Sequence, residues 1–285
     1  MKVWFCIFLV LCCLSGCQRK EKEVAQPVGG EISRYLQSTE VEHGRNLLKE
    51  KTEEMRVKKE EEEKAAEEAQ KKAMKAERLV AIDAGHQGKG DSAQEPIGPG
   101  ASEMKARVSS GTCGVSTGIN EFELNLTVSL KLQQELEDRG YRVVMTRTTH
   151  DVSMSNAERA AIANDAQADI FVRIHANGSE DSSREGALTM CMTPQNPYNG
   201  NLYTQSRQLS EVILDEICRA TQAQRESIIE TDTMSGINWC GVPVTIVEMG
   251  YMTNPEEDRR LNDEAYQKQM VMGIANGIDR YFDTF

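Results

Sequence analysis

The stretch Leu79-Val80-Ala81-Ile82-Asp83-Ala84-Gly85-His86 opens the part of the sequence that has the pattern of a globular fold. Its apolar residues predict a short buried strand that ends at a histidine, and Gly85 permits a sharp turn where a Cβ atom would clash. Open α/β sheets bind ligands at the carboxyl ends of their strands, so a histidine placed there is positioned for chemistry. One such histidine is weak evidence of a site.

Two further apolar segments end in the same way. Residues 169–175 predict a strand that ends at His175, and residues 244–248 predict a strand that ends at Glu248. Each of the three expected strands therefore has a metal-ligating or proton-transferring side chain as its last residue.

Strands and helices are expected to alternate from residue 79 to residue 285. Asn120 and Ser155 each precede a glutamate by three residues, as in a capping box, and each predicts the start of a helix. The segment 87–119, rich in Gly, Pro and Ser, has no periodicity and is expected to be a long loop. This order predicts a single three-layer α/β domain, with a mostly parallel or mixed central sheet flanked by helices. Further expected elements are strands at 141–146 and 186–192 and helices at 203–220 and 263–282.

Residues 1–17 are expected to be a bacterial lipoprotein signal peptide. The apolar run over residues 3–14 is shorter than the about 20 residues that a membrane span requires. Leu14-Ser15-Gly16-Cys17 follows and resembles a lipobox, after which cleavage would leave Cys17 as a lipidated N-terminus. The alternative is a plain secretory signal with an incidental cysteine. Lipidation would anchor the protein to the cell membrane on its extracytoplasmic side, facing the cell wall.

Residues 18–78 are expected to be a charged spacer. They are rich in Glu, Lys, Ala and Gln, which favour helices, but they lack a sustained apolar heptad, so a solvated helix or a partly disordered segment is favoured over a coiled coil. Basic and acidic residues are equal in number over residues 19–78, so the acidic balance of the chain lies in residues 79–285, which carry a formal charge of −13. An acidic domain argues against nucleic acid as a partner.

Four cysteines fall in the expected domain, and none belongs to a Cys-x-x-Cys pair, so a structural zinc knuckle is not supported. Cys113 and Cys240 lie in loop-like sequence, and whether they form a disulfide is left open. Cys191 and Cys218 fit apolar patterns and are expected to be buried. His150, like His43 in the spacer, lies among polar residues and is expected to face solvent.

The remaining histidines and two glutamates form a candidate metal site. Glu121 begins the first helix of the domain. In an α/β sheet, the N-termini of the helices lie at the same edge as the carboxyl ends of the strands. His86, Glu121 and His175 can therefore converge. Two imidazoles and a carboxylate form a ligand set of catalytic zinc sites. Bound zinc lowers the pKa of its water towards about 7 and polarises a substrate carbonyl. Glu248 would take the proton of that water and pass it to the leaving nitrogen.

Each of these residues also has an ordinary structural explanation. A histidine at a strand end often makes only a hydrogen bond, and a glutamate at a helix N-terminus favours the helix dipole. Glu248 is harder to explain in this way, because burying an unpaired carboxylate is costly. Arg147 and Arg159 are expected to be structural ion-pair or loop-capping residues.

Six short motifs follow one another through residues 79–285. They are Asp83-Ala84-Gly85-His86; Glu121 with Leu124-Asn125-Leu126; Arg139-Gly140-Tyr141 leading to Thr146-Arg147; Glu158-Arg159 with Ala163-Asn164; Ile174-His175-Ala176-Asn177; and Val247-Glu248-Met249-Gly250-Tyr251 with Thr253-Asn254. Together they resemble the zinc-dependent N-acetylmuramoyl-L-alanine amidases of the Amidase_3 type, over essentially the whole domain.

The resemblance implies that His86, Glu121 and His175 bind zinc, that Glu248 is catalytic, and that the substrate is peptidoglycan. The bond cut would be the amide between N-acetylmuramic acid and L-alanine of the stem peptide. A zinc peptidase and a non-catalytic wall-binding lipoprotein are the alternatives. The 35 positions from His86 to Glu121 look longer than is usual in the family, and whether this segment covers the cleft, shapes stem-peptide preference or acts as a regulatory plug is left open. The sequence names no protein activator.

Overall fold

The computed structural model describes residues 29–284 of the chain, with side chains from residue 37 onwards. Contacts divide the chain into two units, residues 1–64 and 65–285. The expected signal peptide and Cys17 lie outside the described residues. Within the described part, no helix has both the length and the apolar character needed to span a membrane.

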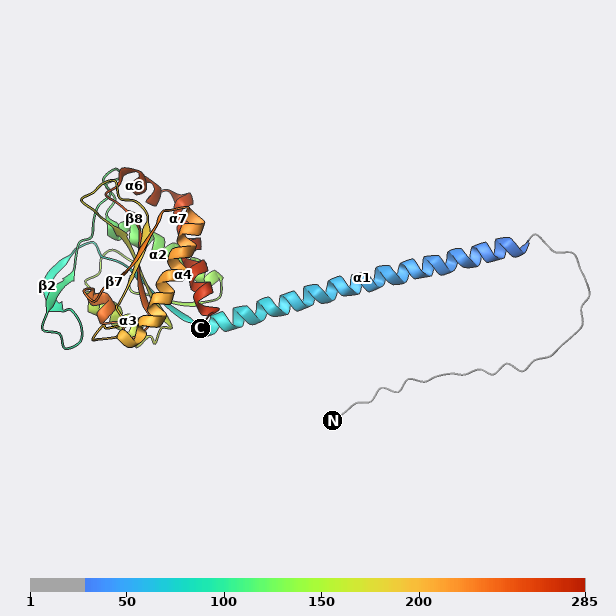
Figure 1. Cartoon of the computed structure of the whole chain (residues 1–285), viewed down its shortest axis with the longest axis horizontal. Helices are drawn as coiled ribbons and strands as arrows, with labels where there is room; N and C mark the ends of the chain where they lie inside the picture. The colour runs from blue at the N-terminus through green and yellow to red at the C-terminus, as the bar shows by residue number, and fades with distance from the viewer. Residues whose placement is uncertain (1–28, 285) are drawn as a thin grey trace, which may run out of the picture. The chain divides into compact units, whose positions relative to one another are not determined.

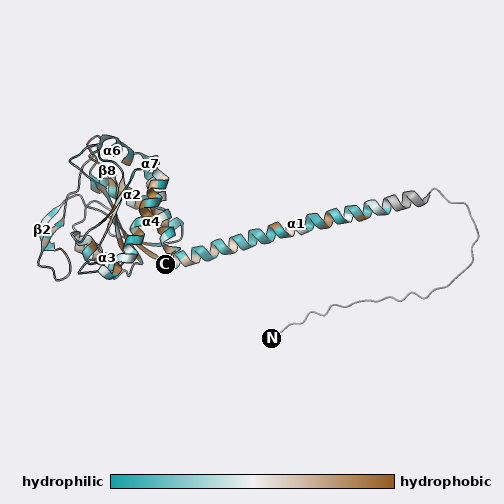
Figure 2. Ribbon diagram, viewed as in Figure 1, coloured by the Kyte–Doolittle hydropathy of each residue, from teal (hydrophilic) through white to brown (hydrophobic). Residues whose placement is uncertain are grey.

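The helix α1 (Gly29–Glu77) forms most of the expected spacer, so these residues are helical. Its side chains from residue 38 to residue 64 are exposed, and Figure 2 shows α1 coloured mostly as hydrophilic. Lys58 lies 3.7 Å from Glu62 and Lys59 lies 3.5 Å from Glu63, each pair one helical turn apart. Such exposed pairs contribute only a few tenths of a kcal/mol each, in the range of about 0.2–0.5.

A six-stranded sheet forms the centre of the domain (Figure 1). Its strands follow the order β4-β1-β5-β8-β6-β7. Only β6 and β8 pair in antiparallel fashion, and all other neighbours are parallel. The predicted mostly parallel, mixed sheet is therefore confirmed. The strands are β1 (Leu79–Ala84), β4 (Arg142–Met145), β5 (Ile170–Asn177), β6 (Ala187–Cys191), β7 (Arg225–Glu230) and β8 (Val244–Tyr251).

Helices cover both faces of this sheet, as the alternating pattern predicts. Val80 and Ile82 of β1 pack with α2 (Glu121–Asp138), α4 (Tyr203–Thr221) and α7 (Glu264–Phe282) in one core cluster. Leu79 and Ala81 point to the opposite face and pack with α3 (Asn156–Asp165) and α5 (Ser235–Asn238). This second face is covered by much shorter helices, and the candidate site lies there. A further short helix, α6 (Pro255–Leu261), follows β8.

The capping boxes form as expected. The backbone N–H of Asn120 donates to Glu123 Oε2 at 2.9 Å, and the backbone N–H of Ser155 donates to Glu158 Oε2 at 2.7 Å. These bonds satisfy backbone donors that have no partner within a helix. They fix where α2 begins, and α2 provides one candidate ligand.

The segment 87–119 is not a plain loop, so that prediction is wrong. It contains an antiparallel hairpin of β2 (Asp91–Pro96) and β3 (Met104–Val108). The hairpin has little alternation of apolar residues because only two of its eleven side chains, those of Glu95 and Val108, are buried. It is held by its neighbours: Arg107 pairs with Glu158 of α3 at 2.8 Å, and the Trp239 indole N–H donates to the Pro96 carbonyl at 2.8 Å. The strand β7 and the short helices α5 and α6 are also absent from the sequence prediction.

The three strands do not end at their functional residues, which corrects a second expectation. The strand β1 ends at Ala84, and His86 lies two residues beyond it with a φ of +59°. His175 and Glu248 lie inside β5 and β8, which continue to Asn177 and Tyr251.

The four cysteines of the domain are free, so Cys113 and Cys240 form no disulfide. Cys191 is buried as expected, whereas Cys218 is half-buried against the core. His150 is exposed, as predicted. His43 is also exposed.

Candidate metal centre

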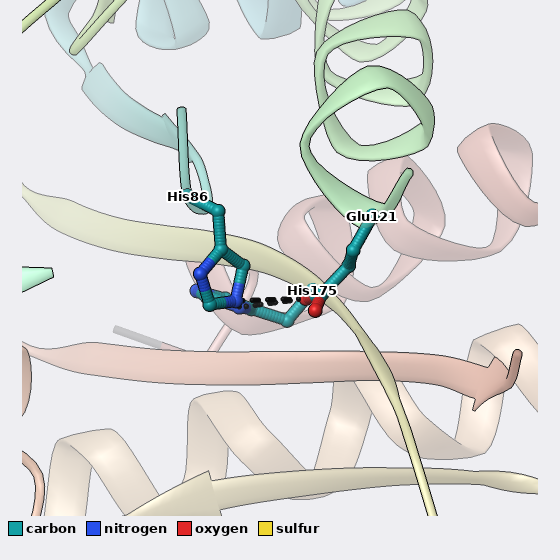
Figure 3. A group of neighbouring side chains, drawn as sticks. All are labelled: His86, Glu121 and His175. Atoms are coloured by element: carbon teal, nitrogen blue, oxygen red, sulfur yellow. Dashed lines mark hydrogen bonds and ion pairs between the residues drawn. The ribbon is translucent and has the colours of Figure 1, made fainter. Parts of the chain in front are cut away.

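Three side chains from distant parts of the sequence meet at the carboxyl end of β1 (Figure 3). The distance from His86 Nε2 to Glu121 Oε1 is 3.0 Å. His175 Nδ1 lies 3.2 Å from Glu121 Oε1 and 3.2 Å from His86 Nε2. The three predicted ligands are therefore brought together, each through one atom.

The spacing of these atoms fits a single metal ion. With bonds of about 2.0–2.1 Å, two ligands of a tetrahedral zinc ion lie roughly 3.3 Å apart. The observed separations of 3.0–3.2 Å are close to this value. Among the side chains that the structure describes, this is the one group of three or more His, Cys, Asp or Glu residues so placed.

His86 is oriented by the turn that follows β1. Its positive φ is uncommon for a residue with a Cβ, and such conformations concentrate at functional sites. Its ring Nδ1 lies 2.9 Å from the backbone carbonyl of Ser109, to which it donates. The proton on Nδ1 leaves Nε2 with a free lone pair that faces the other two ligands, as metal-bound histidines require.

Glu121 is the first residue of α2 and is held by backbone groups. Its Oε2 accepts from the Thr112 N–H at 2.9 Å, and its Oε1 accepts from the Ala176 N–H at 3.2 Å. Burial alone would raise the pKa of this carboxyl, but the contacts with the His175 and His86 rings outweigh burial and hold the pKa well below its usual range. The group is therefore an anion at neutral pH, as a ligand must be.

His175 lies on the face of β5 that carries the site. Burial lowers the pKa of its ring to about 4, although the hydrogen bond with Glu121 acts in the opposite direction. The ring is therefore neutral at pH 7 and able to bind a metal. Gly85 is needed beneath this ring, because a Cβ at that position would lie 2.3 Å from His175 ring atoms.

Glu248 lies beside the three ligands, since it is the register partner of His175 between β5 and β8. Its Oε2 is buried and has no hydrogen-bond partner among the described residues. Burial, together with the negative charge of Glu121, raises the pKa of Glu248 to about 8, while Arg173 opposes the shift. A buried carboxyl without a partner is costly, and a cation held by the neighbouring ligands would offset that cost. The donor set and this orphaned oxygen both fit a divalent metal.

A cavity of about 230 Å³ adjoins the ligands on the face covered by α3 and α5. His86, His175 and Glu248 line it, so a substrate in the cavity would reach the metal-binding atoms and the free carboxyl together. Its other walls come from the hairpin, α3, α5 and the sheet: Lys105, Ala106, Ser109, Asn156, Arg173, Met190, Met234, Ser235, Gly236 and Ile246.

The two arginines expected to be structural do stabilise the turn that carries His86. Arg147 donates to the carbonyls of Ala84 and Gly85 at 2.8 and 3.0 Å. Arg159 is fully buried, pairs with Asp83 at 2.7 Å and donates to the His86 carbonyl at 2.9 Å. Asp83 also binds Arg173, so one carboxylate serves two buried guanidinium groups.

We expect Asp83→Asn to lower the free energy of unfolding by about 3–5 kcal/mol, because it leaves two buried cations without their shared anion. Burial alone would raise the pKa of Asp83, but the charges of Arg159 and Arg173 outweigh burial and lower it strongly. A lowered pKa means that the stabilisation is complete above the unfolded-state pKa of about 3.9 and is lost as the pH falls below it.

Urea unfolding between pH 3 and pH 7 measures this effect. The wild type should lose stability towards pH 3 more steeply than Asp83→Asn. The exposed Asp151 provides a control, since Asp151→Asn should change stability by no more than about 0.5 kcal/mol. Equal stability of wild type and Asp83→Asn at pH 7 would contradict the structural role.

Several residues of the site are absent from the sequence prediction. Asn125 donates to Glu121 Oε1 at 3.2 Å. Because Asn125 lies four residues after Glu121 on the same helix face, the sequence could have indicated this contact. Gly111, Thr112 and the Ser109 carbonyl contact the ligands from the segment after the hairpin. Two of these contacts use backbone atoms of a distant segment, so no side-chain pattern could have revealed them.

The sequence matches the Amidase_3 family, described as N-acetylmuramoyl-L-alanine amidase, over residues 80–280. It is 31% identical to the uncharacterized protein YqiI of Bacillus subtilis, over 72% of this chain and 85% of that protein. It is 25% identical to the N-acetylmuramoyl-L-alanine amidase AmiC of Neisseria meningitidis, over 72% of this chain and 53% of that protein.

Solved structures agree with these matches. The fold resembles Ami1, an N-acetylmuramyl-L-alanine amidase from Mycobacterium smegmatis, with a TM-score of 0.66 and 25% identity over 73% of this chain and 98% of that chain. It also resembles the catalytic domain of CwlV, an N-acetylmuramoyl-L-alanine amidase from Bacillus (Paenibacillus) polymyxa var. colistinus. There the TM-score is 0.58, and the 27% identity extends over 73% of this chain and 99% of that chain.

Proposed function

The chain belongs to the Amidase_3 family of N-acetylmuramoyl-L-alanine amidases, and on this premise we propose how its own residues carry out that activity. The protein is an N-acetylmuramoyl-L-alanine amidase of the cell wall. The proposal assigns His86, Glu121 and His175 as ligands of a zinc ion, Glu248 as the general base, and peptidoglycan as the substrate. The bond cut joins the lactyl group of N-acetylmuramic acid to L-alanine of the stem peptide.

Zinc, when bound, supplies a Lewis acid that polarises the substrate carbonyl and makes a water molecule more acidic. The residues present suit this ion, because two neutral imidazoles and one carboxylate are a common catalytic zinc set. Hydrogen bonds from His86 to Ser109, and from Thr112 and Asn125 to Glu121, hold the ligand atoms in place.

Glu248 provides the proton transfer that amide hydrolysis requires. Its free Oε2 would take a proton from the attacking water and return it to the nitrogen of L-alanine as the C–N bond breaks. The leaving nitrogen needs this proton because an amide anion is a poor leaving group. Glu248 therefore acts first as a base towards the water and then as an acid towards the nitrogen, so it ends the reaction in the protonation state in which it began.

One observation carries this proposal: His86 and His175, two of the three converging ligands, line a cavity together with Glu248, whose buried Oε2 has no hydrogen-bond partner among the described residues. A purely wall-binding protein has no need for such a costly carboxyl. A zinc peptidase has the same chemistry, and family membership favours the muramoyl amide over a peptide bond.

Mass spectrometry of products from purified peptidoglycan tests the bond assignment. The proposal expects free stem peptides that begin at L-alanine, together with glycan strands whose lactyl groups end in a carboxylate. Fragments cut within the stem peptide would instead identify a peptidase. Intact peptidoglycan, with metal bound, would support the wall-binding alternative.

We also propose that the protein is lipid-anchored to the outer side of the cell membrane through Cys17, with residues 18–78 as the spacer and residues 79–285 as the catalytic domain. The resemblance of Leu14-Ser15-Gly16-Cys17 to a lipobox supports this localisation. A helix of 49 residues extends about 70 Å at 1.5 Å per residue. Such a length suits a spacer that bridges membrane and wall.

Cys17→Ala should abolish incorporation of labelled fatty acid and release the protein from the membrane fraction. Two acyl chains bind a membrane firmly, so the wild type should remain in that fraction after a salt wash. Cys13→Ala is the matched control, since it lies inside the expected signal peptide. Retention of Cys17→Ala in the membrane fraction would contradict the anchor.

A further inference from the structure

Lys105 of the hairpin extends across the cavity beside the metal-binding residues. Its ammonium donates to the backbone carbonyl of Thr233 at 2.8 Å and lies 4.0 Å from Met234 Sδ. Thr233 and Met234 precede α5, on the opposite wall of the same cavity. No carboxylate among the described residues pairs with this ammonium, although the chain is strongly acidic. An ammonium has three donors, so one of them is left unused by these two contacts.

Arg173 adds a second positive charge at the floor of the cavity. Its Nε donates to Asp83 and its Nη2 to Asn156, each at 2.9 Å. Its Nη1 has no hydrogen-bond partner among the described residues. This nitrogen faces α5, because a Cβ on Gly236 would lie 1.8 Å from it, and both residues line the cavity.

The charge around Arg173 is not neutralised locally. Asp83 is shared with Arg159, so two guanidinium groups oppose a single carboxylate. Arg173 itself is 3% exposed, which leaves little solvent to screen its charge.

We propose that Lys105 and Arg173 form a carboxylate-binding subsite that selects stem peptides with a free carboxylate next to the cleaved amide. This proposal rests on the amidase function above and names the substrate class of the same site. The chemistry matches, since guanidinium and ammonium groups form charge-assisted hydrogen bonds with carboxylates. The hairpin thereby has a recognition role, because it alone supplies Lys105.

The position of the cavity indicates which carboxylate can bind. The cavity, of about 230 Å³, adjoins His86 and His175, so a carboxylate bound in it lies close to the cleaved amide. The recognised carboxylate therefore belongs to the residue that follows L-alanine in the stem peptide. Met190, Met234 and Ile246 provide apolar walls for the connecting carbons.

The subsite is tested by comparing the hydrolysis of two muramoyl peptides. They differ only in this carboxyl, which is free in one peptide and amidated in the other. The wild type should favour the free carboxylate by about tenfold in kcat/KM, chiefly through KM, as expected for one charge-assisted hydrogen bond. Lys105→Met should reduce this preference severalfold, because only Arg173 then faces the carboxylate, and Lys105→Arg should restore it. Higher ionic strength should also weaken the preference of the wild type.

Lys89 provides the matched control, because it is exposed on the same segment and does not line the cavity. Lys89→Met should keep the tenfold preference. A wild type that hydrolyses both substrates equally, or a Lys105→Met variant that keeps the full preference, would overturn the subsite and leave the amidase function intact. A wild type that releases no peptide from either substrate would overturn both.

Discussion

Glu248→Ala should retain its metal and lose hydrolysis. Glu248 is not among the three converging ligand atoms, so its removal leaves the metal site intact. Its loss removes the group that accepts and returns the proton, and general acid–base groups typically contribute about 10²- to 10⁴-fold. We therefore expect kcat to fall by that factor, with zinc content near one per chain. The folded state should be unharmed, because the variant also removes a buried carboxyl without a partner.

Peptide release from purified peptidoglycan and zinc content by elemental analysis measure the two parts of this expectation. Glu137→Ala is the control, because Glu137 is an exposed residue of α2 and lies outside the cavity. It should match the wild type in both measurements. Full activity of Glu248→Ala would remove Glu248 from the mechanism, and loss of zinc would make it a ligand instead.

His175→Ala should lose the metal. His175 contributes one of the three ligand atoms, at 3.2 Å from each of the other two. Even residues that only orient a metal ligand lower affinity by about 10- to 100-fold when replaced, and a lost ligand costs more. Zinc should therefore fall to trace levels at micromolar protein, and hydrolysis should fall with it. The substitution also leaves His86 and Glu121 as a pair, which is too few for a structural or catalytic zinc site.

His150→Ala is the matched control for this variant, since His150 is exposed and outside the site. Its zinc content and activity should equal those of the wild type. Circular dichroism of both variants separates loss of metal from loss of fold. A folded His175→Ala protein with unchanged zinc content would contradict the ligand assignment.

The sequence predicts the fold well where the pattern is local. Buried strands read as apolar runs, as in Leu79–Ala84, and capping residues such as Ser155 mark helix starts because their bonds lie within one turn. The hairpin of β2 and β3 has no such local pattern, because few of its side chains are buried and it is held by Glu158 and Trp239, which lie far along the chain.

The same distinction explains the site. His86, Glu121 and His175 are predictable, because each stands at a point that the α/β topology brings to one edge of the sheet. The need for glycine at position 85 arises from the His175 ring on β5, and His86 with its φ of +59° is held by Ser109 and Arg159, so no local pattern encodes either feature. Asp83 is similar: its two arginine partners become visible only when the strands and α3 are packed together.

Anomalous diffraction at the zinc absorption edge, from crystals of the purified protein, is the most direct test of the central claim. The account predicts one anomalous peak within about 2.0–2.2 Å of His86 Nε2, Glu121 Oε1 and His175 Nδ1, beside the Glu248 carboxyl. A zinc-loaded crystal in which these three atoms hold no ion, or hold it together with Glu248 as a closed fourth ligand, would contradict the account.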